Sequence, residues 1–293
     1  MKEKPYVKVA MYALNIIFAI IIIVPVIYCF NVSMMDLKEI YGGKFWPSHL
    51  TIENYTRAFQ LAPFFTFIKN SLIVSGVITF AQVVTGALAA YAFAMMEFKG
   101  KKVLFYIMLA TMMIPSQAII IANYLTIADW GIRNTYAALI LPNAAAAFAV
   151  FNMRQAFLTL PKEIHEAAEI DGCTQARFFF QIALPLSKAI IAILVLYYGV
   201  GHWNSYFSAL VYISDKAKYP LQLVLRNILI TNQTALSQTA TTAAARAALQ
   251  EKQQLIDVMK YSLIIISSIP VLVMYPLVQK HFVKGVMIGS MKG

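Results

Sequence analysis

Charged residues are scarce in this chain. Of its 293 residues only 13 % are Asp, Glu, Lys or Arg, whereas 60 % are hydrophobic. Soluble domains carry about 25 % charged residues, so the surplus of apolar side chains is expected to face lipid. The formal net charge of +11 is then attributed to Lys and Arg that flank membrane spans. No basic cluster alternates with aromatic residues as in a nucleic-acid-binding surface.

Other absences exclude several chemistries. The two cysteines, Cys29 and Cys173, lie far apart without metal-ligand spacing, so we expect free thiols and no metal site. The sequence has no His-Glu-x-x-His motif and no Gly-x-x-x-x-Gly-Lys-Ser/Thr motif, which argues against a metalloprotease and against ATP binding by this chain. The predicted spans hold few ionisable groups, chiefly Arg154 and His202. Ion-coupled pumps depend on such groups, so a transporter of this composition must borrow its energy.

Six apolar segments are long enough to cross a membrane as helices. They cover residues 11–34, 71–95, 103–124, 136–158, 189–213 and 261–279. The first is longer than the apolar part of a signal peptide and no small-residue cleavage site follows, so we expect a retained anchor. Short basic segments stay in the cytoplasm, and lysines before span one, at 99–102 and after span six fall on one side. We therefore predict an all-α membrane protein, one domain over residues 1–293, with both termini cytoplasmic.

Prolines and outer segments carry further expectations. Prolines inside spans should kink their helix or pack against a neighbour. They are Pro25, Pro115, Pro142, Pro270 and Pro276. In the outer segment 35–70, Thr51 should cap a short amphipathic helix. Residues 231–254 are rich in Thr, Ala and Gln, and because Ala, Leu, Gln and Glu favour helices, we expect an outer helix that leads into span six.

The cytoplasmic segment 159–188, between spans four and five, predicts two short helices. Pro161 suits the first turn of a helix, and Gly172 suits a left-handed turn at its end. A second short helix should follow Thr174 and end at Pro185.

The first of these helices should present one flat face. The residues that recur there at helical spacing are Ile164, Ala167, Ala168 and Asp171. From the residues alone, two interpretations stay open. The pair could dock in a groove of a partner protein, or it could lie on the bilayer as an amphipathic hairpin that buries Phe178, Phe179 and Phe180.

This segment resembles the EAA motif of binding-protein-dependent ATP-binding-cassette (ABC) importers. The matching residues are Glu166, Ala167, Ala168, Gly172, Ile182, Leu184 and Pro185. The resemblance covers nearly the whole chain: Asn54-Tyr55, His202-Trp203-Asn204 and the ending from Phe282 to Gly293 look like the shorter permease of maltose-type carbohydrate importers. That ending and residues 243–254 look closer to the subgroup for complex saccharides, including alginate-type oligosaccharides. Where the maltose-type relative has a Gly-rich stretch before span six, this chain has Thr and Ala, so that contact with the binding protein is not carried over.

The resemblance implies a type I ABC importer permease fold with six transmembrane helices in the bacterial cytoplasmic (inner) membrane. It implies a non-catalytic subunit that translocates an oligosaccharide and binds no cofactor, with ATP and Mg on the partners. Those partners are a second permease, two ATPase subunits and an extracytoplasmic solute-binding protein, besides membrane lipid, and nucleic acid is not among them. The motif residues would contact the ATPase subunits, and so would Gly289, Ser290, Lys292 and Gly293 at the C-terminus.

Span five supplies the candidate substrate pathway, since aromatic faces and amides hold sugars. The candidates are Tyr197, Trp203, Asn204 and Tyr206, which would otherwise pack against helices or form an interfacial aromatic belt. Two other functions stay open. The chain could be an ABC permease for a non-sugar solute such as an amino acid or phosphate. It could also be a membrane-embedded transferase that uses the acidic cluster Glu163, Glu166, Glu169 and Asp171, although such clusters more often mark a solvated helix face.

Overall fold

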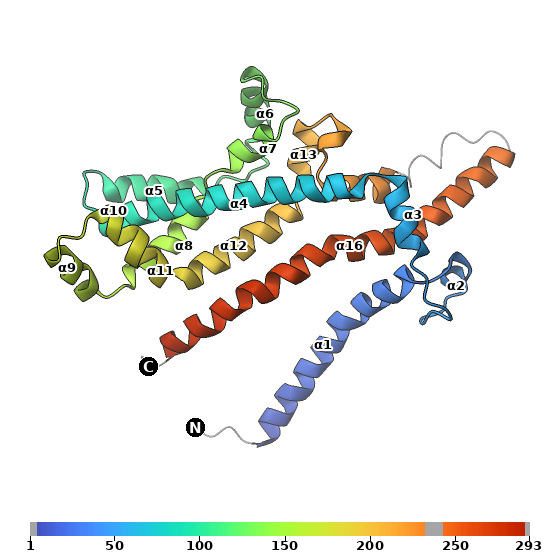
Figure 1. Ribbon diagram of the computed structural model, residues 1–293, viewed down its shortest axis with the longest axis horizontal. Helices are drawn as coiled ribbons and strands as arrows, with labels where there is room; N and C mark the ends of the chain where they lie inside the picture. Colours follow the sequence, from blue (N-terminus) through green and yellow to red (C-terminus); the bar gives the residue numbers. More distant parts are fainter. Residues whose placement is uncertain (1–4, 232–242, 291–293) are drawn as a thin grey trace. The chain divides into compact units, whose positions relative to one another are not determined.

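The computed structural model describes residues 5–231 and 243–290, and every regular element within these ranges is a helix (Figure 1). The chain forms two compact units. The first contains the residues up to 65 together with 224–269, and the second contains residues 66–223 together with those from 270 onward.

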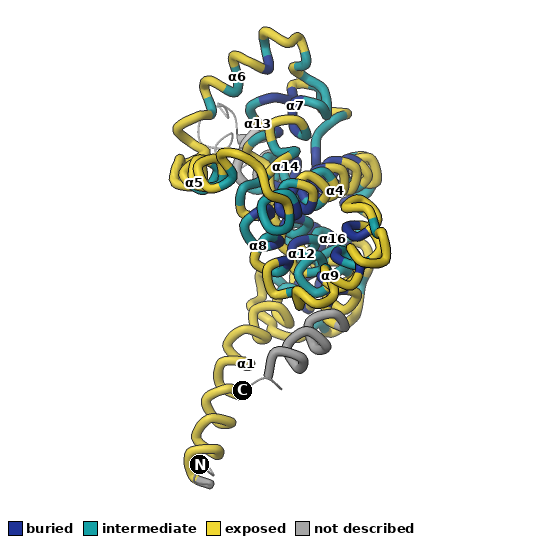
Figure 2. The backbone as a smooth tube through the Cα atoms, turned by 90° about the vertical axis from the view of Figure 1, so that its left-hand side faces the viewer, coloured by how far each residue is buried: buried dark blue, intermediate teal, exposed yellow. Residues whose placement is uncertain are grey.

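The first unit begins with helix α1 (Pro5–Ser33). Its 29 residues span about 43 Å at 1.5 Å per residue, enough to cross the roughly 30 Å hydrocarbon core. The helix continues through Pro25 without a break. Residues 6–28 of the helix are exposed (Figure 2), as expected of a helix that faces lipid or another membrane helix, and only its last turn is buried.

A polar turn fixes the end of α1. It is followed by α2 (Leu37–Tyr41) and α3 (Glu53–Leu61). Asn54 is buried and donates through Nδ2 to the carbonyl oxygens of Ser33 at 3.1 Å and Met35 at 2.8 Å. The hydroxyls of Ser33 and Tyr55 lie 2.7 Å apart. The Asn54-Tyr55 pair therefore holds the chain as it leaves α1.

The predicted cap of α3 is displaced by one position. Ile52, rather than Thr51, is the N-cap residue, and its side chain makes no capping hydrogen bond. Thr51 still satisfies one amide of the first turn, because its Oγ1 accepts from the backbone N–H of Glu53 at 3.1 Å.

Three helices among the described residues are long and apolar enough to span a membrane, and the number rises to five if two bent helix pairs each count as one span. The three single helices are Tyr6–Ser33 in α1, Phe64–Met95 (α4) and Met259–Gln279 in α16. The other two are pairs of helices that meet at a bend. The first pair comprises α7 (Ala137–Ile140), η1 (Leu141–Asn143) and α8 (Ala147–Leu158), bent by 45°. The second comprises α10 (Gln175–Phe178), η2 (Phe179–Ala183), α11 (Leu184–Leu186) and α12 (Lys188–Trp203), bent by 75°.

The predicted span over residues 103–124 is not one continuous helix. Helix α5 (Lys101–Thr111) stops before Pro115, and α6 begins only at Ile120 and continues to Asp129. Proline cannot donate to the helix ladder and disfavours helical geometry at the residue before it, here Ile114. Pro115 therefore lies in a break between two helices, whereas Pro142 lies within η1 and the 45° bend follows at residues 144–146, where Ala146 is extended.

The predicted fifth span also ends early. Helix α12 stops at Trp203, and a short helix, α13 (Phe207–Tyr212), follows after three residues. The chain continues through η3 (Lys216–Lys218), α14 (Leu221–Arg226) and η4 (Asn227–Thr231). The predicted second short helix of the cytoplasmic segment ends one residue later than predicted, at Leu186 rather than Pro185, with Ser187 as C-cap.

Helix α16 (Ala243–Ser290) combines the predicted outer helix and span six in 48 continuous residues. It includes Pro270 and Pro276 without interruption. The part of the expectation that falls on residues 232–242 lies outside the described residues.

Small residues let α4 and α8 approach closely in the second unit. The small residues Ala87 and Ala90 of α4 and Ala149 of α8 are buried in one cluster, together with the larger Met153 of α8 and Leu194 of α12. At the crossing, a Cβ added to Gly86 would lie only 2.7 Å from the Cβ of Ala149. Glycine at this position therefore sets the distance between the two helices.

Candidate functional site

The EAA segment forms a rigid elbow in the second unit. Helix α9 (Lys162–Ile170) begins after Pro161 and ends at Asp171. Gly172 then has φ of +72°, which confirms the predicted left-handed turn. Thr174 caps α10 by accepting from the backbone N–H of Arg177 at 3.3 Å. The predicted order of helix, glycine turn and helix is therefore confirmed.

An aromatic cluster fixes the elbow to α4 and α8. The ring of Tyr91 in α4 lies 5.0 Å from Phe179 and 6.0 Å from Phe157, measured between centroids. Its hydroxyl contacts Gln175 Oε1 at 2.6 Å. Phe178 is buried in the same cluster and meets the ring of His165 in α9 edge-on at 4.8 Å. The phenylalanines therefore face the protein interior, apart from Phe180, which is exposed.

The motif residues divide between the interior and the surface. Ala168 is only 8 % exposed and belongs to the aromatic cluster, whereas its neighbour Ala167 is exposed. The prediction that both alanines share one outward face is therefore wrong, because packing on Phe178 turns one of them inward. Ile182 and Leu184 pack against the same cluster, so they support the elbow from within.

Sequence reasoning missed the most prominent apolar residue of α9. Ile170 is 87 % exposed at the end of the helix. The sequence contained one signal for it, because Ile170 is an isoleucine at the end of the predicted helix, two positions before the glycine of the left-handed turn. Glu166 instead lines a groove of about 340 Å³ together with His165, Glu169 and residues at the ends of α4 and α8.

A polar cavity of about 430 Å³ lies among the helices of the second unit. Its polar lining comprises Ser71, Gln82, Asn143, Tyr197, Tyr198, His202, Ser205 and Ser208. Gln82 of α4 is buried, and its Oε1 lies 3.0 Å from Nε2 of His202 in α12, a contact that requires the proton on Nε2. The rings of Tyr198 and His202 stack at 6.2 Å. The lining residues include neither a carboxylate nor an ammonium or guanidinium group.

The four pathway candidates of span five lie in different places. Tyr197 lines the polar cavity. Trp203 is 3 % exposed and lines a separate, largely apolar groove instead. Asn204 accepts a hydrogen bond from Gln222 at 3.4 Å, and Tyr206 is exposed, and neither lines the cavity. The structure therefore retains one of the four in the cavity and adds Gln82 and Asn143, which belong to other helices.

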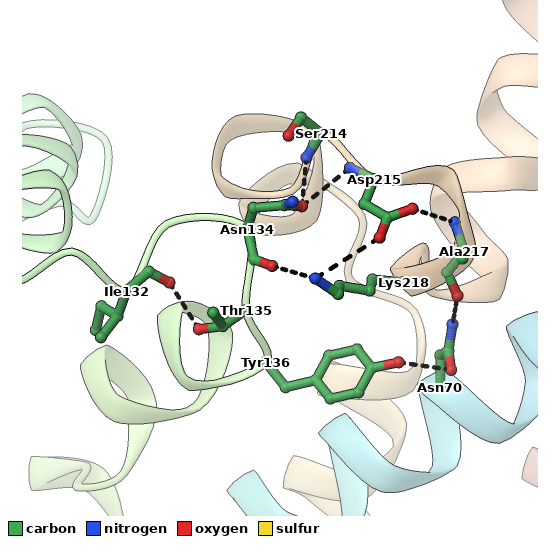
Figure 3. Close-up of polar contacts among 9 residues, drawn as sticks. All are labelled: Asn70, Ile132, Asn134, Thr135, Tyr136, Ser214, Asp215, Ala217 and Lys218. Carbon is green, nitrogen blue, oxygen red and sulfur yellow. Dashed lines mark hydrogen bonds and ion pairs between the residues drawn. The ribbon is translucent and has the colours of Figure 1, made fainter.

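A polar clasp of hydrogen bonds joins residues 134–136, residues 214–218 and α4 (Figure 3). Residues on either side of 214–218, such as Ser208 and Pro220, line the cavity. Asn134 has a positive φ of 60°, and its Oδ1 accepts from the backbone N–H groups of Ser214 and Asp215 at 3.1 and 2.9 Å. Lys218 donates to the backbone oxygen of Asn134 at 2.9 Å and pairs with Asp215 at 3.6 Å.

The first turns of α4 complete the clasp. Asn70 donates through Nδ2 to the carbonyl oxygen of Ala217 at 2.8 Å, and its Oδ1 accepts from the hydroxyl of Tyr136 at 2.7 Å (Figure 3). The clasp thus joins three separate stretches of the second unit. It also positions the segment that carries Ser205 and Ser208 into the cavity lining.

The predicted C-terminal contact with the ATPase subunits and the expected lack of a metal site concern other parts of the chain. Lys292 and Gly293 lie outside the described residues, and only the helical backbone is described at Gly289 and Ser290. Within the described residues no group of three or more His, Cys, Asp or Glu side chains could hold a metal ion.

The fold is that of ABC importer permeases. A crystal structure of a bacterial ABC transporter involved in the import of the acidic polysaccharide alginate matches with a TM-score of 0.82 at 24 % identity, over 96 % of this chain and 98 % of that one. The predicted all-α permease fold is thereby confirmed, whereas the described helices give at most five of the six expected spans.

The sequence comparison identifies the family. A model described as binding-protein-dependent transport system inner membrane component matches residues 82–288, and the chain belongs to this family of transporter permeases. Protein LplC of Bacillus subtilis (strain 168) is 36 % identical over 93 % of this chain and 90 % of the relative. The polygalacturonan/rhamnogalacturonan transport system permease protein YtcP of the same organism is 31 % identical over 96 % of each chain. The arabinooligosaccharides transport system permease protein AraQ of Halalkalibacterium halodurans is 30 % identical over 85 % of this chain and 82 % of the relative.

Proposed function

We propose that this chain moves an oligosaccharide across the cytoplasmic membrane, with the 430 Å³ polar cavity on the route. The cavity carries the proposal because its lining combines hydroxyls, amides and tyrosine rings from separate helices. Such groups can exchange hydrogen bonds with sugar hydroxyls while the rings cover the apolar faces of the sugar. The named substrates of YtcP and AraQ are also saccharides.

The proposed energy source is ATP hydrolysis on partner subunits. This chain would work with a second permease, two ATPase subunits that carry ATP and Mg, and an extracytoplasmic solute-binding protein. Ala167 and Ile170 form the exposed side of α9 that we assign to an ATPase cleft, while Ala168 and Gly172 hold the helix in place. We assign the tail 289–293 to the ATPase subunits as well.

The proposed topology places α9 and both termini in the cytoplasm. Lys99, Lys101 and Lys102 crowd the short turn between α4 and α5, and short basic segments are retained on the cytoplasmic side. Bulky polar segments such as residues 35–63 would then lie outside.

The test is ATP-driven uptake by the complex reconstituted in vesicles, with a labelled oligosaccharide delivered by the binding protein. Gln82→Leu removes the partner of His202 and a polar group of the cavity, and uptake should fall about tenfold, since an orphaned buried polar group costs about 1–3 kcal/mol. The matched control is Gln155→Leu, an exposed glutamine of α8 outside the cavity.

Equal uptake by Gln82→Leu and Gln155→Leu would show that the substrate does not pass through the cavity. The isolated chain should show no ATP hydrolysis, and measurable hydrolysis by the clean chain would contradict the proposed division of labour.

A further inference from the structure

A second cavity, of about 600 Å³, lies where α4, α5 and α8 meet in the second unit. Its lining combines three cationic residues with aromatic ones. These residues are Phe93, Glu97, Phe98, Gly100, Lys101, Lys102, Val103, Phe105, Tyr106 and Arg154. The cavity is distinct from the polar cavity of the proposed sugar route, because the two share no lining residue.

Arg154 reaches into this cavity from α8. Its Nε donates to the carbonyl oxygen of Phe93 at 3.1 Å, and its guanidinium lies 4.3 Å from the ring centroid of Phe105. These contacts fix the side chain. Its two terminal nitrogens have no partner among the described residues, so four N–H donors remain for a ligand.

The beginning of α5 supplies two lysines of different character. Lys101 is held by the carbonyl oxygen of Met96 at 2.8 Å and by Glu97 at 3.1 Å. Lys102 makes no hydrogen bond or ion pair with the described part of the chain. The first amides of α5 also lack an acceptor within the helix, and the helix dipole favours an anion there. Glu97 is the one carboxylate of the lining, and its side chain is 91 % exposed and already paired.

The floor of the cavity is aromatic. Phe93 lies 5.8 Å from Phe98 and 5.5 Å from Phe105, measured between ring centroids. Beside them, Val103 and Tyr106 are among the exposed apolar residues on the outer side of α5. The cavity thus offers cations and an apolar surface together, on a helix whose outer side suits lipid.

We propose that this cavity binds the phosphate of an anionic phospholipid from the cytoplasmic leaflet, with Arg154 and Lys102 on the phosphate and the phenylalanines against the glycerol and first acyl carbons. The proposal relies on the cytoplasmic placement of the turn at 96–100 and is independent of the transported solute. If the lysines only kept this turn on the cytoplasmic side, their positive charge alone would be enough. That role would not need an arginine from another helix, held over aromatic rings.

The test measures binding to the purified full-length chain in neutral detergent, by native mass spectrometry with phosphatidylglycerol, phosphatidylcholine or inorganic phosphate as probe. Lys102→Gln should weaken phosphatidylglycerol binding about five- to tenfold, since a basic residue near an anionic lipid contributes about 1 kcal/mol or more. Lys99→Gln is the matched control, because it removes the same charge three positions away and Lys99 does not line the cavity. Arg154→Lys keeps the positive charge but loses the planar set of N–H donors of the guanidinium group. The double variant with Lys102→Gln and Arg154→Lys should therefore bind phosphatidylglycerol more weakly than Arg154→Lys alone.

Each outcome supports or overturns the proposal. Selective loss in Lys102→Gln, with Lys99→Gln within twofold of the unaltered chain, supports it. Equal losses in both variants would mean diffuse charge attraction, and tight binding of phosphatidylcholine would mean that the phosphate charge is not recognised. Competition by millimolar inorganic phosphate would assign the site to free phosphate. The measurement involves no transport, so its failure is distinguishable from a failure of the proposed function.

Discussion

Adding a methyl group at Gly86 should separate α4 from α8. The new Cβ would lie 2.7 Å from the Cβ of Ala149, at least 0.7 Å short of ordinary van der Waals contact, which begins at 3.4 Å. The backbone of α8 lies next to it, with Ala149 C at 3.5 Å and Val150 N at 3.6 Å. Because a Cβ cannot rotate away, the helices must move apart, and overpacking of this kind costs about 1–3 kcal/mol.

The assay is the thermal stability of the purified chain in detergent, compared with uptake by the reconstituted complex. Gly86→Ala should unfold at a lower temperature and transport less. The double variant Gly86→Ala with Ala149→Gly restores the total volume at the crossing by exchanging which helix carries the methyl group, and should recover most of the loss. Gly76→Ala is the control on the same helix, since nothing lies within 4 Å of its added Cβ, and alanine should be neutral or favour the helix by about 0.5–1 kcal/mol.

The reasoning fails if Gly86→Ala is as stable as the unaltered chain. It also fails if the double variant is no more stable than Gly86→Ala, because the close approach of the two helices would then not limit the packing.

Three further predictions concern the elbow and the tail. Gly172→Val should lower solute-stimulated ATP hydrolysis of the complex, because φ of +72° costs a branched residue about 1–2 kcal/mol or more, whereas Gly172→Asn should be milder; equal activities would contradict this. Ala168→Trp should destabilise the isolated chain, whereas Ala167→Trp should spare it but reduce co-purification of the ATPase subunit; stronger binding of Ala167→Trp to lipid vesicles with unchanged co-purification would favour the membrane-surface hairpin. Deletion of residues 289–293 should reduce ATP-driven uptake, and normal uptake would show that the tail makes no needed contact.

The elbow could be predicted because its signals are local. A proline, a glycine and a threonine act on their own neighbours. The structure places Gly172 and Thr174 as expected, and Pro161 lies one position before the predicted first turn, as the N-cap residue. The direction of each alanine could not be predicted in the same way. Ala167 and Ala168 differ in burial because Phe178 packs against one side of α9, and this contact depends on the path of the chain after Gly172.

The cavities were beyond sequence reasoning for a related reason. Gln82, Asn143 and His202 belong to three helices, and no spacing along the chain relates them. Hydropathy also hid the break at Pro115, because the residues on both sides are apolar enough for one continuous span. The helix is interrupted around Pro115, whereas Pro142 lies within η1 and α16 continues through Pro270 and Pro276, so the effect of a proline depends on the packing around it.

The aromatic cluster at the elbow has a mechanical consequence. Tyr91, which contacts Phe179 and Gln175, and Gln82, which lines the polar cavity, are nine residues apart on the same helix, or about 13 Å. A displacement of α9 therefore passes through a stack of rings into a stiff rod, with no loop in between to absorb it. If α9 is the segment that a partner moves, as proposed, its motion would reach the wall of the cavity through these rings, and the coupling would depend on how firmly the rings are packed.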